Sequence, residues 1–191
     1  MQDRSKTARA TSVPMYALGA IFLVPLTIGV LMVSSSATRN DHANQISRDV
    51  ASMYAQGVDF SNPANQNIAL NVAGGLGVDI RAGRGVLILS KLRMVHDNDC
   101  AANSSENCAN KGYVVVVQRF VIGNAGLRGS SFGSPASIDP KTGGVRNWMA
   151  DVTARAQDFT GTLKAGETTY AAECYLASSD AGNGIYSRAM F

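Results

Sequence analysis

The stretch PMYALGAIFLVPLTIGVLMV, from Pro14 to Val33, decides how the rest of the chain is interpreted. It contains no charged residue, and its side chains are almost all apolar. An α-helix rises about 1.5 Å per residue, so a helix of this length spans about 30 Å, the thickness of the hydrocarbon core of a bilayer. We therefore predict a transmembrane helix over residues 14–34, preceded by a short basic tail at residues 1–13.

Two other interpretations of this stretch stay open. A secretory signal peptide has an apolar region of about 7–15 residues before a small-residue cleavage site, and the sequence SSSA at residues 34–37 could act as one. The apolar run is long for that interpretation. A buried helix of a soluble domain normally has a polar face, which this stretch lacks.

The flanking charges predict an orientation. Arg4, Lys6 and Arg9 precede the stretch, and only Asp3 opposes them. Lysine and arginine are enriched on the cytoplasmic side of membrane helices. We therefore expect a cytoplasmic N-terminus and an exported part, residues 35–191, that consists of a stem helix and one α+β domain.

The predicted span also contains residues that suit packing against other helices. Gly19, Ala20 and Gly29 are small and allow a neighbouring helix to approach closely. Pro25 breaks one backbone hydrogen bond, which transmembrane helices tolerate when neighbouring groups replace it.

The exported part changes from helical to strand patterns along its length. Apolar residues at helical spacing predict helices over residues 38–56 and 64–76, and the segment 147–159 is a candidate short helix. Aliphatic and β-branched runs predict four strands, at residues 85–95, 113–122, 167–177 and 184–191. Since most strands are joined by loops, we expect a small, mostly antiparallel meander in an α+β domain.

The three cysteines suggest different roles. Cys100 and Cys108 lie at the two ends of a polar loop between the first two strands, where an exported domain would oxidise them to a disulfide. Zinc binding is the alternative, with His96 nearby, but the spacing is wide for a zinc site. Cys174 alternates with apolar neighbours along its strand, which predicts a small buried residue.

No motif indicates catalysis, a cofactor or a metal. The glycine-rich GGLGVD follows a helix and lacks the spacing of a nucleotide-binding loop, so it predicts a helix end. Asp97, Asp99 and Glu106 could suggest calcium but lack the order of a calcium-binding loop, so we expect a solvated tip. With 16% charged residues and a net charge of +3, nucleic-acid binding is not favoured. We expect no enzyme and no small-molecule substrate.

Four quoted segments together resemble a known family. They are ISRDVASMYAQGVDFS, GVLILSKLRMV, QRFVIGNAGLRGSSFGSP and GIYSRAMF. With the basic tail and apolar span, they resemble the TadE-like family of minor-pilin-like (pseudopilin) subunits of tight-adherence pilus machinery. The resemblance implies a single-pass protein of the bacterial inner membrane with a periplasmic or extracellular C-terminal part. Its implied role is structural, in pilus assembly or secretion, and its implied partners are other pilin-like subunits and membrane lipid.

One position departs from the family pattern. Many members have a glutamate at the start of the span that marks the prepilin-peptidase site, and Met15 stands there in this chain. We therefore expect an anchor that is not processed.

The alternative function is a membrane-anchored module that binds a ligand or an adhesion target. Phe120, Phe132, Trp148 and Tyr170 are the aromatic residues that could line its pocket.

Overall fold

The computed structural model describes the backbone of residues 7–76, 80–102, 108–177 and 184–191. Side chains in these segments are described from residue 22 onward, apart from residues 32, 33, 35, 36 and 102. The chain divides into two units, Met1–Arg39 and Asn40–Phe191. Helix α1 (Thr7–Ala55) forms the described part of the first unit and contributes its C-terminal turns to the second.

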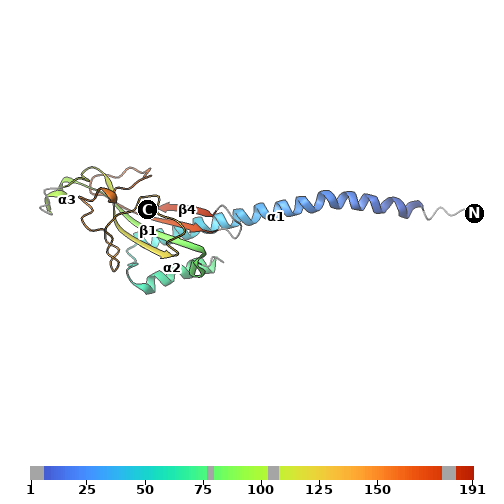
Figure 1. Ribbon diagram of the computed structural model, residues 1–191, viewed down its shortest axis with the longest axis horizontal. Helices are drawn as coiled ribbons and strands as arrows, with labels where there is room; N and C mark the ends of the chain where they lie inside the picture. Colours follow the sequence, from blue (N-terminus) through green and yellow to red (C-terminus); the bar gives the residue numbers. More distant parts are fainter. Residues whose placement is uncertain (1–6, 77–79, 103–107, 178–183) are drawn as a thin grey trace, which may run out of the picture. The chain divides into compact units, whose positions relative to one another are not determined.

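The second unit has the α+β composition that the sequence predicts, with four strands near their expected positions (Figure 1). Every strand pair is antiparallel. After α1, the elements are α2 (Pro63–Gly75), η1 (Ile80–Arg84), β1 (Gly85–Met94), α3 (Asp97–Ala102), β2 (Val114–Gly123), η2 (Val152–Ala154), β3 (Thr168–Leu176) and β4 (Ile185–Met190).

The strand order β2-β1-β3-β4 corrects the expected meander, which would place β2 between β1 and β3. β1 instead lies in the middle, and its first six residues, 85–90, are all buried. A strand that is covered on both faces has a continuous apolar run rather than alternating polar residues. The run GVLIL therefore favours the central position, and the chain from β2 to β3 has to cross back over the sheet.

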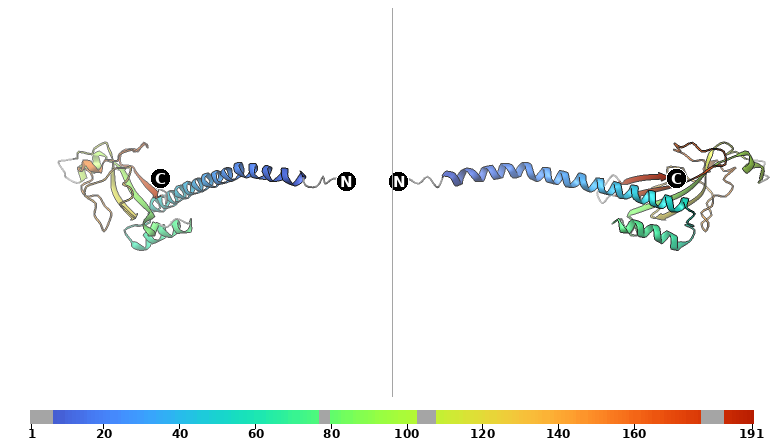
Figure 2. Two further views of the ribbon diagram at one scale, coloured as in Figure 1. Left: turned by 45° about the vertical axis from the view of Figure 1, so that its right-hand side comes forward. Right: turned by 180° about the vertical axis from the view of Figure 1, so that it is seen from behind.

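One face of the sheet packs against α2 and the C-terminal turns of α1 (Figure 2). Ile46, Val50 and Tyr54 of α1 are buried there, at the helical spacing predicted for the stem. α2 begins at Pro63, where the side chain of Asn62 accepts a hydrogen bond from the backbone of Ala64. This cap satisfies one of the backbone donors that the first turn leaves free.

The other face is covered by the long connection between β2 and β3, residues 124–167, and not by the helix expected at 147–159. Only the short 3-10 turn η2 forms within that range. Asn147 begins the segment with a positive φ of 49°. Farther along, the backbone N–H of Ala156 donates to Val114 of β2 at 2.8 Å. Backbone groups that a helix would pair internally are therefore committed to the sheet.

Candidate functional site

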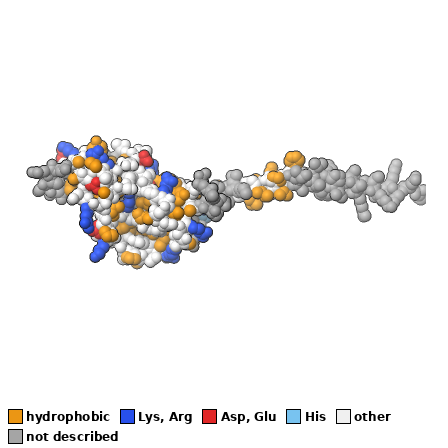
Figure 3. Space-filling view, viewed as in Figure 1, with side chains coloured by type: hydrophobic (Ala, Val, Ile, Leu, Met, Phe, Trp, Pro, Cys, Tyr) orange, Lys and Arg blue, Asp and Glu red, His pale blue; other side chains and the backbone are white. Residues whose placement is uncertain are grey.

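The described part of the first unit exposes a run of large apolar side chains on α1. All residues from 22 to 31 are exposed, and Phe22 and Leu31 are exposed by 74% and 68%. We call residues 22–31 the exposed apolar stretch. Hydrophobic side chains dominate its surface in the space-filling view (Figure 3). Apolar surface gathered in this way marks contact with a membrane or with another protein.

The one side-chain hydroxyl of this stretch is satisfied within the helix. Pro25 has no N–H, and the hydroxyl of the nearby Thr27 donates to the carbonyl of Val24 at 2.9 Å. A Cβ added to Gly29 would meet nothing within 4 Å. Leu26, Gly29, Val30 and Ser34 line a groove of about 490 Å³ on this side of the helix. The surface is therefore apolar, with a notch at the glycine.

Not all of the predicted span can be compared with the structure. The side chains of Met15, Gly19 and Ala20 lie outside those that the structure describes. Within the described residues, no helix is both long enough and apolar enough to cross a bilayer. Pro25 and Gly29 are exposed on α1, and the boundaries predicted at residues 14 and 34 stay a prediction.

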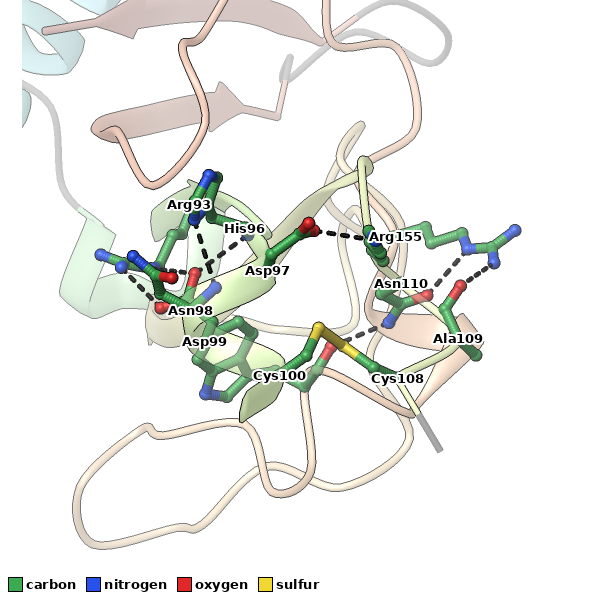
Figure 4. Close-up of a disulfide and its surroundings, with 12 residues drawn as sticks. Arg93, His96, Asp97, Asn98, Asp99, Cys100, Cys108, Ala109, Asn110 and Arg155 are labelled. Carbon is green, nitrogen blue, oxygen red and sulfur yellow. Dashed lines mark hydrogen bonds and ion pairs between the residues drawn. A yellow bond between two sulfur atoms is a disulfide. The ribbon is translucent and has the colours of Figure 1, made fainter. Parts of the chain in front are cut away.

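Cys100 and Cys108 form a disulfide, as the sequence predicts (Figure 4). Their Cα atoms are 5.8 Å apart. Cys100 lies in the short helix α3, so the connection between β1 and β2 is not simply a loop. With both sulfurs bonded to each other, neither thiolate is available for the zinc site considered above.

The expectation of a wholly solvated tip is wrong for Asp99. Its carboxylate pairs with Arg93 of β1 at 2.7 Å and accepts from the backbone N–H of His96 at 3.0 Å (Figure 4). The hydrogen bond from Arg93 lowers the pKa of Asp99. Glu106 lies outside the described residues. Among the residues that the structure describes, no group of three or more His, Cys, Asp or Glu side chains is placed to hold a metal.

A buried asparagine follows the disulfide and fixes the turn before η2. Asn110 is fully buried, and its amide donates to the carbonyls of Trp148 at 2.8 Å and Asp151 at 2.6 Å. Its side-chain oxygen accepts from Arg155 at 2.8 Å, and that guanidinium also stacks 3.8 Å from the ring of Tyr113. Asn110 thus joins the disulfide-bonded segment to the chain that covers the sheet.

Cys174 is fully buried beside Ala172 and Leu176 on the helix-facing side of β3, as the alternation predicts. Burial raises the pKa of its thiol to about 12. A thiol is a poor nucleophile in that state, because thiolate is the reactive form. The structure therefore places Cys174 as a packing residue.

The four aromatic residues of the alternative function do not share a pocket. Phe120 and Tyr170 belong to the core between sheet and helices, whereas Phe132 and Trp148 belong to the core on the opposite face. The sheet separates the two pairs. Each pair contributes to packing, and a common binding pocket for the four is ruled out.

A buried polar network that no sequence pattern indicated holds the connection at residues 124–167, which we call the covering segment, to the sheet. Arg119 of β2 and Glu173 of β3 lie on the face of the sheet that this segment covers. They are exposed by only 6% and 2%. Glu173 accepts hydrogen bonds from the hydroxyl of Ser130, from the backbone of Ser131 at 2.8 Å and from Tyr186 at 2.6 Å. The network ties residues 130 and 131 to β3 and β4. The only sign of this network in the sequence is one charged residue among the mostly apolar residues of β2 and of β3, at Arg119 and Glu173.

Arg119 uses two of its nitrogens in this region. Nε donates to the hydroxyl of Ser90 at 3.1 Å, and another nitrogen donates to the carbonyl of Gly133. Burial lowers the pKa of Arg119 to about 10, and the nearby charge of Glu173 partly opposes this shift. Even so, the guanidinium is protonated at neutral pH. The network is a structural clamp, and it presents no reacting group to solvent.

Comparison of the chain with models of known families, with curated proteins and with solved structures finds no match. The fold defines a class, an α+β domain in which a long N-terminal helix packs its C-terminal turns on a four-stranded antiparallel sheet. The resemblance to the TadE-like family stays a prediction.

Proposed function

We propose that this protein is a membrane-anchored structural subunit of a pilus-assembly or secretion machine of the tight-adherence type. The observation that carries the proposal is the exposed apolar stretch of α1, continuous in sequence with the apolar residues before it. Such a surface needs lipid or the apolar helices of other subunits around it. In this proposal, residues 14–34 anchor the chain in the bacterial inner membrane and residues 35–191 lie outside the cytoplasm.

The disulfide supports an exported location for the second unit. Disulfides persist in oxidising compartments such as the bacterial periplasm and are rare in the cytosol. The Cys100–Cys108 bond closes the connection between β1 and β2. This agrees with the orientation that the basic residues 4, 6 and 9 favour.

Anchoring is tested by fractionating cells that produce the full chain. We expect the protein to stay in the membrane pellet after an alkaline carbonate wash. The double variant Leu26→Arg and Val30→Arg puts two charges into the exposed apolar stretch and should release a large fraction into the supernatant. A control with Arg48→Ala, in the second unit, should stay in the pellet. Wild-type protein that washes off completely would refute the anchor.

A role in assembly is tested separately with Gly29→Leu. The added side chain keeps the helix apolar, and a Cβ at this position would meet nothing within 4 Å, so anchoring should persist. It fills the notch that a neighbouring helix would occupy, so we expect surface filaments to be reduced in a strain carrying only this variant. Leu31→Phe adds bulk elsewhere on the helix as a control. Normal filaments in a strain that lacks the gene would refute the pilus role.

A further inference from the structure

The two edges of the sheet differ in how they are covered. Along β2, the covering segment supplies backbone partners: Val145 donates to Val117 at 2.9 Å, and Ala156 donates to Val114 at 2.8 Å. An edge covered in this way cannot accept another strand. This leaves β4 as the edge at which a further strand could pair.

The register of β4 shows which of its backbone groups point outward. Tyr170 of β3 and Phe191 exchange both of their backbone hydrogen bonds at 2.8 Å. Because such pairs alternate in an antiparallel ladder, the N–H and C=O groups of Tyr186, Arg188 and Met190 face away from β3. Within the described part of the chain, no backbone group pairs with them.

A polar groove of about 440 Å³ runs along this edge, between β4 and the part of α1 in the second unit. Figure 1 shows β4 beside α1. An extended segment paired with β4 would turn every second side chain toward this groove. The lining residues are Asp41, Asn44, Gln45, Arg48, Asp49, Ser187 and Arg188.

The charge at the centre of the edge selects the occupant. Arg188 is the middle one of the three outward-facing residues. Its guanidinium donates to the carbonyl of Asp158 at 3.2 Å, and its register partner on β3 is Glu173, but it forms no ion pair among the described residues. A second copy pairing antiparallel about this residue would place two arginines opposite each other, which is unfavourable. An acidic side chain at that position would form a favourable cross-strand pair instead. The edge therefore suits a different chain better than a second copy.

We propose that the outer edge of β4 is a docking site for an extended segment of a partner protein, which adds a strand to the sheet and places an acidic side chain opposite Arg188. Main-chain hydrogen bonds to Tyr186, Arg188 and Met190 would supply affinity, and the acidic residue would supply specificity. The neighbouring side chains of that segment would be polar, because they face the groove. This surface lies within the second unit, so the proposal does not depend on the membrane anchor.

The test uses the full chain in mild detergent and two synthetic peptides of alternating threonine and valine, identical except for a central glutamate or lysine. Fluorescence anisotropy should show the glutamate peptide binding about fivefold more tightly. Arg188→Glu should reverse this order. Met190→Pro should weaken both peptides, since it removes an outward N–H and leaves the bonds to β3 intact. Lys164→Glu, a charge reversal elsewhere, should change neither.

Amide hydrogen exchange keeps the proposal testable if a variant does not fold. In wild-type protein, the amides of Tyr186, Arg188 and Met190 should exchange rapidly alone and slowly with the glutamate peptide. Protection of these amides without peptide would overturn the proposal, because the edge would already be covered. Equal binding of both peptides, or self-association that Met190→Pro abolishes, would also overturn it.

Discussion

Replacing Asn110 with alanine should detach the turn before η2 from the disulfide-bonded segment. The substitution removes two donated hydrogen bonds, to Trp148 and Asp151, and one accepted from Arg155. Each contributes about 0.5–1.5 kcal/mol net, and the buried carbonyls left behind add a penalty. We expect the free energy of unfolding to fall by about 3 kcal/mol. For a domain of this size, that lowers the melting temperature by about 6–12 °C.

The assay is thermal unfolding of the full chain in detergent, followed by tryptophan fluorescence. Trp148 is the only tryptophan in the chain, and Asn110 binds its carbonyl, so emission reports on this turn. The control is Asn98→Ala, because the side chain of Asn98 is exposed and lies in the same region. A loss below about 0.5 kcal/mol, or a loss equal to that of the control, would refute the argued role of Asn110.

Three further predictions concern stability. The double variant Cys100→Ser and Cys108→Ser should lose about 2–3 kcal/mol in urea unfolding, and a reductant should destabilise wild type but not the variant. Burial raises the pKa of Tyr54, so its stabilising contribution is intact below the ordinary pKa of tyrosine and is lost as pH rises toward the folded value. Tyr54→Phe should therefore flatten the alkaline loss of stability measured by circular dichroism; an unchanged profile would contradict this. Gly123→Ala should destabilise by more than 1 kcal/mol, because Gly123 has a φ of 96° and the added Cβ would lie 2.6 Å from the carbonyl oxygen of Gly85; a melting temperature equal to wild type would contradict it.

The regular elements were predictable because their patterns are local. The stem residues Ile46, Val50 and Tyr54 repeat at helical spacing, and all three are buried. Cys174 alternates with apolar neighbours, and it packs inward. In each case the residues that determine the structure lie within a few positions of one another, so one segment carries enough information.

The covering segment was not predictable in the same way. Residues 147–159 have a composition suited to a helix, but Asn110, far away in the sequence, binds the carbonyls that such a helix would need. The buried residues Arg119 and Glu173 were missed for the same reason, since several of their partners come from residues 130–133. These features depend on long-range pairing, which no local pattern records.

The way the covering segment is attached has a consequence for variation and engineering. Several of its bonds to β2 run from main chain to main chain, as in Val145 to Val117 and Ala156 to Val114. Bonds of that kind do not depend on side-chain identity. Exposed positions between these anchor points can therefore accept new side chains, while insertions would break the spacing that brings the main chains together. These exposed positions are therefore suited to a substituted reporter residue, while the buried residues of the segment, such as Phe132, have to be kept.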